Sequence, residues 1–227
     1  MSVSQADVRK IQELVASALG PPNGWTKWDG GWPGDIESAL VDAVFSARAV
    51  YTTKNKRGVL ALVETWQGER LRTSYDLTAL ASEIASDGPI VWAKRFGNSQ
   101  HSPSRPATAP GGPTKAASVL EAAKALSAIG VSSAEDITDA TVVNVKREMM
   151  GIPGIGFATT NYFLMLLGRP GVKPDTMVHR FLATACGHGY NNRDAEEAVT
   201  TVAGELGVLA HLLDHAIWSY ESSRARG

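Results

Sequence analysis

Residues 151–175 read GIPGIGFATTNYFLMLLGRPGVKPD and contain two features that can do chemistry. The first is a turn with three glycines, Gly151, Gly154 and Gly156, where a backbone without Cβ atoms can come close to a ligand. A helix that opens at Gly156 points free N–H groups and its positive end outward, where they can bind a phosphate oxygen. A plain hairpin of two helices with a tight glycine turn is the alternative.

The second feature is one acidic residue, Asp175, at the end of the Gly/Pro-rich loop GRPGVKP. The helical pattern TMVHRFLAT follows directly, so Asp175 is predicted to cap that helix. The leading end of a helix also favours an ionised carboxylate, and a fixed anion stabilises a cation that develops beside it. Capping and electrostatic catalysis are therefore compatible roles for this side chain.

Helices must position these residues. Apolar residues recur at spacings of three and four, alternating strand patterns are absent, and the sequence predicts an all-α fold. Residues 23–34 form a loop that holds three tryptophans, and residues 97–113 form a second loop rich in proline and glycine. The predicted helices cover residues 8–19, 36–50, 56–66, 75–86, 114–130, 139–150, 156–167, 175–185, 192–205 and 208–222.

The composition is that of a folded protein, and it does not indicate which kind of partner the protein binds. The 227 residues are 44% hydrophobic, which is ample for a packed interior in one large domain or two small ones. Lys and Arg number 22 against 23 Asp and Glu, so the net charge gives no overall signal for a polyanionic partner. Local amide clusters and a one-sided distribution of lysines can still bind phosphate.

The single cysteine, Cys186, excludes an intramolecular disulfide and any cluster held mainly by thiolates, and it fits a reducing compartment. The charged N-terminal residues predict no secretory signal, and the apolar residues 159–167 are too few to cross a bilayer. We therefore expect a cytoplasmic protein without a membrane partner.

The order of the motifs resembles that of the helix-hairpin-helix (HhH-GPD) DNA glycosylases: G-I-P-G-I-G, an apolar helix, a Gly/Pro loop, then P-D-T-M-V-H-R-F. The likeness is strong over residues 151–182 and weaker over the remainder of residues 35–222, including the helix that begins at Thr114-Lys115-Ala116. In this resemblance Asp175 matches the essential aspartate of the family.

The resemblance implies an all-α fold of two helical lobes with a cleft between them. One lobe would comprise residues 36–170 and end in the hairpin, and the other would combine residues 1–35 with residues 171–227, which carry the aspartate. The hairpin would bind the DNA backbone through Gly151, Gly154, Ile155, Gly156, Ala158 and Thr159, with a Na⁺ or K⁺ ion on the carbonyls of Ile152 and Ile155.

Two differences from the family pattern argue against a strand-cleaving lyase activity and against an iron–sulfur cluster. Bifunctional members carry a Schiff-base lysine where this chain has Ala158, and neither Lys146 nor Lys173 matches that position. Without that amine, β-lyase strand cleavage loses its nucleophile. The cluster-bearing branch needs several C-terminal cysteines where only Cys186 exists, so no iron–sulfur cluster is expected.

Arg48 stands where many relatives place a glutamine in a segment that reaches into the opened duplex. Arg48 and Tyr51 are therefore candidates to fill the space that an extruded base leaves, through hydrogen bonds and stacking. A solvated side chain at a helix end is the alternative for both residues.

Trp25, Trp28 and Trp32 are candidates for the wall of a base pocket, because their rings offer stacking surfaces to an extruded, electron-poor base. G-I-G-F-A-T-T-N-Y-F also resembles the branch that removes alkylated purines. Tryptophans that only fill the core are the alternative.

The histidines admit both functional and structural roles. His211 and His215 have the spacing of a metal-ligating pair, but no third ligand is evident, and packing beside Trp218 is the better interpretation. His179 can hydrogen-bond near Asp175 or serve the structure. Cys186 and His188 are interpreted as part of a helix end.

The resulting hypothesis is a monofunctional DNA glycosylase that hydrolyses the N-glycosidic bond of a damaged or mismatched base, with alkylated purine favoured, and leaves an abasic site. Asp175 would stabilise the positive charge on the sugar and orient a water molecule. The expected partner is duplex DNA with a lesion, and the protein is expected to act as a monomer. The alternative is a catalytically inactive helix-hairpin-helix DNA-binding protein on the same fold.

Overall fold

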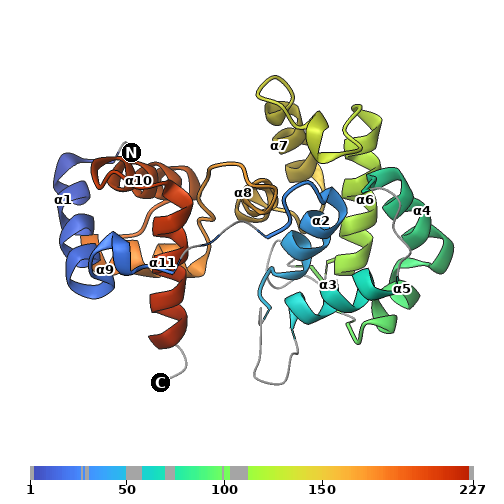
Figure 1. The fold of residues 1–227 in the computed structure, drawn as a ribbon, viewed down its shortest axis with the longest axis horizontal. Helices are drawn as coiled ribbons and strands as arrows, with labels where there is room; N and C mark the ends of the chain where they lie inside the picture. The colour runs from blue at the N-terminus through green and yellow to red at the C-terminus, as the bar shows by residue number, and fades with distance from the viewer. Residues whose placement is uncertain are drawn as a thin grey trace. The chain divides into compact units, whose positions relative to one another are not determined.

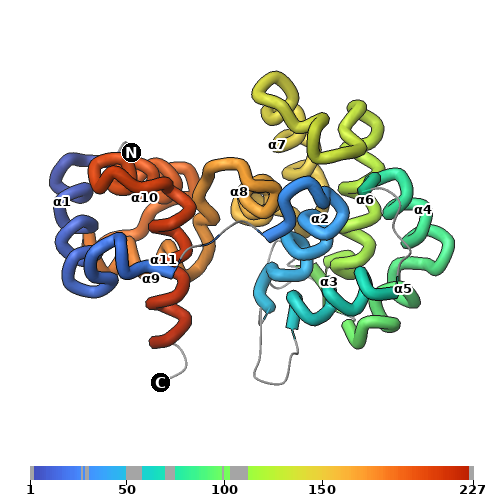
Figure 2. Tube along the Cα trace, in the orientation of Figure 1, coloured from blue at the N-terminus to red at the C-terminus, as the bar shows by residue number. Residues whose placement is uncertain are grey.

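The computed structural model describes residues 3–26, 28, 31–49, 58–69, 75–98, 100–102 and 112–224. These residues form helices joined by turns, with no strand among them and one isolated antiparallel bridge between His101 and Thr114 (Figures 1 and 2). The predicted all-α class is confirmed. No helix within the described ranges has the length and apolar character needed to span a bilayer.

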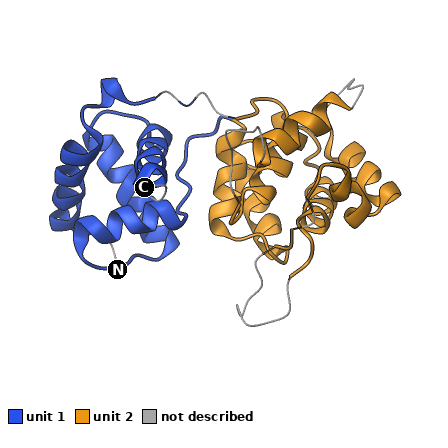
Figure 3. Cartoon of the chain, turned by 90° about the horizontal axis from the view of Figure 1, so that it is seen from below, with its two compact units in different colours: residues 1–30, 168–227 blue, residues 31–167 orange. Residues whose placement is uncertain are grey.

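The chain divides into two compact units (Figure 3). Unit 1 combines the two ends of the chain, Met1–Gly30 and Gly168–Gly227, and unit 2 is the continuous segment Gly31–Leu167. The hairpin motif lies in unit 2, and the loop that ends at Asp175 lies in unit 1. The cleft expected between two lobes stays a prediction.

Unit 2 is built around a helix that is buried along its whole length, α2. The α2 helix packs against α3, α6 and α8, while α4 and α5 cover α6 from another side (Figure 1). Asp35 starts α2 by accepting the backbone N–H of Ser38 at 2.9 Å. The helices of unit 2 are α2 (Ile36–Phe45), α3 (Val59–Gly68), α4 (Leu77–Asp87), α5 (Pro89–Arg95), α6 (Lys115–Ala128), the 3-10 turn Ala134–Asp136, α7 (Val142–Gly151) and α8 (Phe157–Leu166).

Unit 1 has its own apolar core, to which every one of its α-helices contributes. The α9 helix packs against α1, α10 and α11, and α10 also contacts α1 and α11. Because α1 comes from the other end of the chain, this core joins the two termini in one unit (Figure 3). The helices of unit 1 are α1 (Gln5–Leu14), the π-helical turn Val15–Leu19, the 3-10 turn Pro22–Gly24, α9 (Thr176–Cys186), α10 (Asn192–Glu205) and α11 (Ala210–Arg224).

Most helices lie where the apolar spacing predicts them, and their caps follow from the sequence. Thr114 accepts the N–H of Ala117 at the start of α6, and Gly130 ends that region at φ +80°. One helix was not predicted, α5, because Gly88-Pro89 reads as a turn. Proline is compatible with the first position of a helix, since the N–H that it lacks would have no partner there.

Candidate functional site

The predicted hairpin is a helix–turn–helix in which α7 and α8 flank residues 152–156. Gly154 has φ +89°, a conformation that favours glycine. A Cβ atom at this position would lie 2.2 Å from the Cβ of Ser102. Gly154 is therefore required first by the packing of the turn, whatever the turn binds.

A small hydrogen-bond network seats the turn on α6. The hydroxyl of Ser118 donates to the carbonyl of Pro153 at 3.0 Å and lies 2.9 Å from the hydroxyl of Ser102. Ile155 is buried beneath the turn, and its N–H donates to the carbonyl of Ile152 at 3.0 Å. The Ile152 oxygen thus keeps one lone pair for a second partner, and its role at a monovalent cation stays a prediction.

The leading end of α8 is open. Gly156 is the N-cap residue, has no side chain to satisfy the first N–H groups of the helix, and is exposed. A Cβ atom added at Gly156 would meet no atom within 4 Å. Ala158 and Thr159 follow in the first turn and are partly exposed. Within the part of the chain that the structure describes, no side chain caps the first turn of α8, so this turn offers backbone donors and a positive helix end, both of which suit an anion.

Asp175 caps α9, as predicted from its position before the helical pattern. Its Oδ1 atom accepts the backbone N–H of Met177 at 2.8 Å and of Val178 at 3.4 Å. Among the described residues, its Oδ2 atom accepts no hydrogen bond, and the residue is partly exposed. The cap therefore fixes the carboxylate and occupies one oxygen, which leaves the other oxygen for a ligand.

A second carboxyl group, which the sequence did not single out, lies in the electrostatic field of Asp175. Asp214 on α11 is buried, and its burial together with the negative charge of Asp175 raises its pKa to about 8. Near neutral pH the Asp214 carboxyl is therefore mostly protonated. Asp175 lies at the N-cap of α9, a position where the helix dipole favours an anion.

Asp214 also holds the backbone of the loop that ends at Asp175. Its Oδ1 atom accepts the N–H of Lys173 at 3.1 Å, and the carbonyl of Lys173 accepts the N–H of Asp175 at 2.6 Å. The peptide groups of Lys173 thus connect the two acidic residues. This arrangement makes Asp214 a positioning residue for the Asp175 backbone.

Three near-parallel rings form a stack in unit 1, and the central ring is that of His215, the residue after Asp214. Trp28 stacks on His215 with ring centroids 6.4 Å apart, and His215 stacks on Trp218 at 5.7 Å. His211 contacts Trp28 from the side at 5.8 Å. Burial lowers the pKa of both His211 and His215, so both rings are neutral near pH 7. His215 packs against Trp218, as the sequence indicated, and His211 packs against Trp28.

Trp25 lies in the same unit and lines a pocket of about 250 Å³ together with His215 and Tyr220. Its indole N–H donates to the carbonyls of Leu19 and Gly20, which end the π-helical turn. Trp25 is thus both a structural cap and a pocket wall. Its predicted contact with a base stays a prediction.

Trp32 belongs to unit 2 and is anchored at two points. Its indole N–H donates to the buried carboxylate of Asp42 at 2.8 Å, and its backbone N–H donates to the carbonyl of Leu166 at 2.8 Å. These bonds tie the segment before α2 to the end of α8. These bonds give Trp32 a structural role, and its predicted contact with a base stays a prediction.

Arg48 lies just after α2, is exposed, and has φ +53°. No other non-glycine residue within the described ranges has a positive φ. Buried Lys115 holds this turn, because its Nζ donates to the carbonyls of Phe45 and Ala47 at 2.8 and 2.7 Å and to the side chain of Gln100 at 2.6 Å. Arg48 is thus presented on a strained, supported turn. Tyr51, the other insertion candidate, lies outside the described residues.

His179 is explained by the structure. Its Nε2 atom lies 2.8 Å from the side-chain oxygen of Asn192, which begins α10. The contact joins α9 to α10, one helical turn beyond Asp175. It leaves the imidazole with a structural role.

Comparisons with known proteins complete the description of the site. No curated protein matches the chain. A solved structure of a trapped endonuclease III–DNA covalent intermediate, an estranged-adenine complex, is similar with a TM-score of 0.47 and 16% sequence identity, over 95% of this chain and 85% of that chain. The profile of the family DUF8548, a domain of unknown function, matches residues 9–222. Because this match spans nearly the whole sequence, the chain belongs to the DUF8548 family.

Proposed function

We propose that the protein is a monofunctional DNA glycosylase, in which Asp175 assists hydrolysis of the bond between a base and its deoxyribose. The observation that carries the proposal is the state of Asp175: one oxygen is fixed by the N–H groups of α9 and the other is available. The P-D-T-M-V-H-R-F motif in which it lies resembles the catalytic segment of the HhH-GPD glycosylases.

The chemistry requires one anion of fixed position. As the N-glycosidic bond stretches, positive charge grows on the sugar, and a preorganised carboxylate stabilises that charge without the cost of reorganising solvent. The available Oδ2 of Asp175 also accepts a hydrogen bond from the attacking water and can take its proton. Protonated Asp214 supports this role, because it holds the adjacent backbone without adding a second negative charge.

The hairpin would bind the DNA backbone. A nucleotide must leave the base stack before a glycosylase can act on it, at a cost of a few kcal/mol. Contacts between phosphate and the open first turn of α8 would hold the duplex during this step. Exposed Arg48, presented on the turn that Lys115 supports, would fill the space that the extruded nucleotide leaves.

Alkylated purine is the favoured substrate class. Such bases are electron-poor and often carry a positive charge, so they stack well on electron-rich rings. The stack of Trp28, His215 and Trp218 supports this choice, because burial keeps the imidazole neutral and removes its repulsion of a cationic base.

Simple hydrolysis, without strand cleavage, follows from the residues near the hairpin. Ala158 occupies the position that matches the Schiff-base lysine of bifunctional relatives, and a methyl group cannot form an imine. Lys115, whose pKa is lowered to about 8 by burial, is committed to three acceptors and acts as a structural cation.

The experiment is a panel of duplexes that contain alkylated, oxidised, deaminated and mismatched bases, each incubated with the protein and analysed before and after alkali. Strand breaks that need alkali are the expected result. Asp175→Asn retains the helix cap and is expected to lower base release by at least about 100-fold with DNA binding preserved. Asp76→Asn is the matched control, because Asp76 caps α4 by the same kind of bond and has no assigned catalytic role.

Three results would contradict the proposal. Release that survives Asp175→Asn would remove the assigned role of the carboxylate. Breaks without alkali would show that another amine acts as a lyase nucleophile. Binding without release of any base in the panel would favour the alternative, an inactive DNA-binding protein on this fold.

A further inference from the structure

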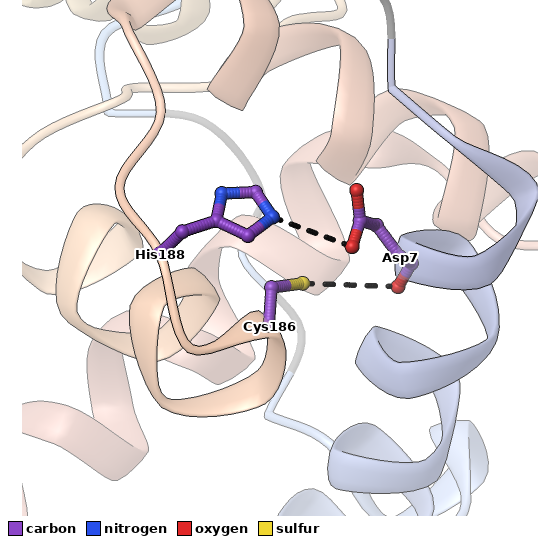
Figure 4. A group of neighbouring side chains, drawn as sticks. All are labelled: Asp7, Cys186 and His188. Carbon is purple, nitrogen blue, oxygen red and sulfur yellow. Dashed lines mark hydrogen bonds and ion pairs between the residues drawn. The ribbon is translucent and has the colours of Figure 1, made fainter.

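Three side chains of different chemical type converge in unit 1, at the packed boundary of α1 and α9. Asp7 lies in the first turn of α1, Cys186 is the last residue of α9, and His188 follows two residues later (Figure 4). Their oxygen, sulfur and nitrogen atoms all lie within 4.8 Å of one another. A carboxylate, a thiolate and an imidazole are the three side-chain ligands that zinc takes in proteins.

The backbone after α9 creates the convergence. Gly187 caps the helix in the left-handed conformation, with φ +76°, and its N–H donates to the carbonyl of Ala183. This turn reverses the chain and directs His188 back toward α1, where its ring lies opposite Asp7 (Figure 4). Turn geometry and helix packing therefore bring Asp7 next to two residues that lie 179 and 181 positions later in the chain.

The hydrogen bonds of His188 orient its ring in a way that is compatible with a metal ion between the ring and Asp7. Its Nδ1 atom lies 3.3 Å from the carbonyl of Gly189, and its Nε2 atom lies 3.4 Å from Oδ1 of Asp7. In a neutral ring, Nδ1–H donates to the Gly189 carbonyl, and the lone pair of Nε2 then faces a carboxylate oxygen. Two acceptors that face each other need a proton or a metal ion between them. A ligating histidine commonly donates its second N–H to a backbone carbonyl, as His188 does here.

The other two side chains of the cluster also accept hydrogen bonds from neighbouring residues. Ser4 donates its hydroxyl to Oδ2 of Asp7 at 2.8 Å, which orients the carboxylate. Tyr190 donates its hydroxyl to the sulfur of Cys186 at 3.3 Å. The thiol donates to the main-chain carbonyl of Asp7 at 3.9 Å, and this long bond is weak and easily replaced.

We propose that Asp7, Cys186 and His188 bind a divalent transition-metal ion of the zinc type, with water as a fourth ligand. A mixed sulfur, nitrogen and oxygen set favours zinc over calcium or magnesium, which prefer oxygen ligands alone. The His188 side chain is 50% exposed, which gives the ion a path of entry and space for the water. The bound ion would join α1 to the end of α9 and so crosslink the N-terminal helix to a helix from the C-terminal part of the chain.

Binding has a defined proton balance. The metal–sulfur bond forms as the Cys186 thiol loses its proton to solvent, because the thiolate is the form that binds the metal.

The test uses the full chain, stripped with a chelator and kept reduced, and titrated with Zn²⁺ in competition with a chromophoric chelator. One ion per chain is expected, and His188→Ala and Cys186→Ser are each expected to weaken binding by at least about 100-fold. His101→Ala is the control, because His101 is an exposed histidine of unit 2 outside the cluster. Absence of saturable binding, or equal affinity in the variants and the parent, would overturn the proposal.

Cobalt supplies a direct readout of the sulfur ligand. Co²⁺ in place of Zn²⁺ is expected to give a thiolate-to-metal charge-transfer band in the parent and in His101→Ala, and no such band in Cys186→Ser. A bound Co²⁺ ion without that band would overturn the assignment. His188→Ala removes a half-exposed ring and Cys186→Ser replaces one atom, so circular dichroism can confirm that each variant is folded before its affinity is interpreted.

Discussion

The side chain of Asp214 accepts the backbone N–H of Lys173 at 3.1 Å, and in this way α11 holds the loop that delivers Asp175 to the start of α9. The same carboxyl is buried and lies in the field of Asp175. Asp175 and Asp214 are thus close in unit 1, and their carboxyl groups have different roles. Asp175 lies at the leading end of α9, and Asp214, which is mostly protonated near neutral pH, fixes the backbone before it.

Asp214→Asn is expected to change how stability depends on pH. The pKa of Asp214 is raised from 3.8 to about 8 in the folded state, so between these values the folded protein holds a proton that the unfolded chain has lost. The contribution of Asp214 is fully present below the lower value and is lost as pH rises toward the higher one. The free energy of unfolding of the parent, relative to Asp214→Asn, should fall by about 1.4 kcal/mol per pH unit in this window. Urea unfolding at several pH values measures it, and a constant difference would contradict the assignment.

Gly154 and Gly156 are expected to respond differently to alanine. Gly154→Ala brings a Cβ atom against Ser102 at a positive φ, so it should destabilise unit 2 by about 2–4 kcal/mol. Gly156→Ala meets open space and should cost about 1 kcal/mol or less.

The two glycine variants also distinguish an effect on folding from an effect on DNA binding. Gly156→Ala should weaken binding to duplexes of any sequence, because phosphate contacts carry no base information. Gly68→Ala is the control, since Gly68 is exposed at the end of α3 in the same unit, also has no neighbour within 4 Å, and is assigned no contact with DNA. Fluorescence anisotropy measures both affinities, and equal binding by Gly156→Ala and the parent would show that α8 does not contact the phosphates.

Trp28→Ala is expected to lower kcat/KM for release of an alkylated purine by about 10- to 100-fold, because stacking of a base on an aromatic ring contributes about 1–3 kcal/mol. Trp28→Phe keeps a stacking surface on His215 and should retain most of the activity. Binding to a duplex that already contains an abasic site should be unaffected by either change. An unaltered rate in Trp28→Ala would place the base elsewhere.

Lys115→Met is expected to destabilise unit 2 by about 2–5 kcal/mol, since the carbonyls of Phe45 and Ala47 each lose a buried donor. Lys124→Met is the matched control on the same helix, because Lys124 is exposed and pairs only with Glu121 at the surface. Thermal unfolding compares the two variants. Similar losses would mean that Lys115 does not hold the turn that presents Arg48.

The sequence by itself determined the helical class, most of the helices and the capping role of Asp175. These features depend on residues within a turn or two of each other: apolar spacing sets the buried face of each helix, and Thr114 and Asp175 satisfy N–H groups that lie two or three residues away. The α5 helix was not predicted, because its start, Gly88-Pro89, is a dipeptide that suits both a turn and the beginning of a helix.

Only the tertiary structure decided which distant side chains share an environment. The raised pKa of Asp214 depends on burial in unit 1 and on a carboxylate 39 positions earlier in the chain, and neither is readable from the residues around it. Asp7 meets Cys186 and His188 because helices from opposite ends of the sequence pack in one core. Gly154 is constrained by Ser102, far from its own turn. Desolvation, charge coupling and steric fit all act through space, so they become known only when the fold has placed the atoms.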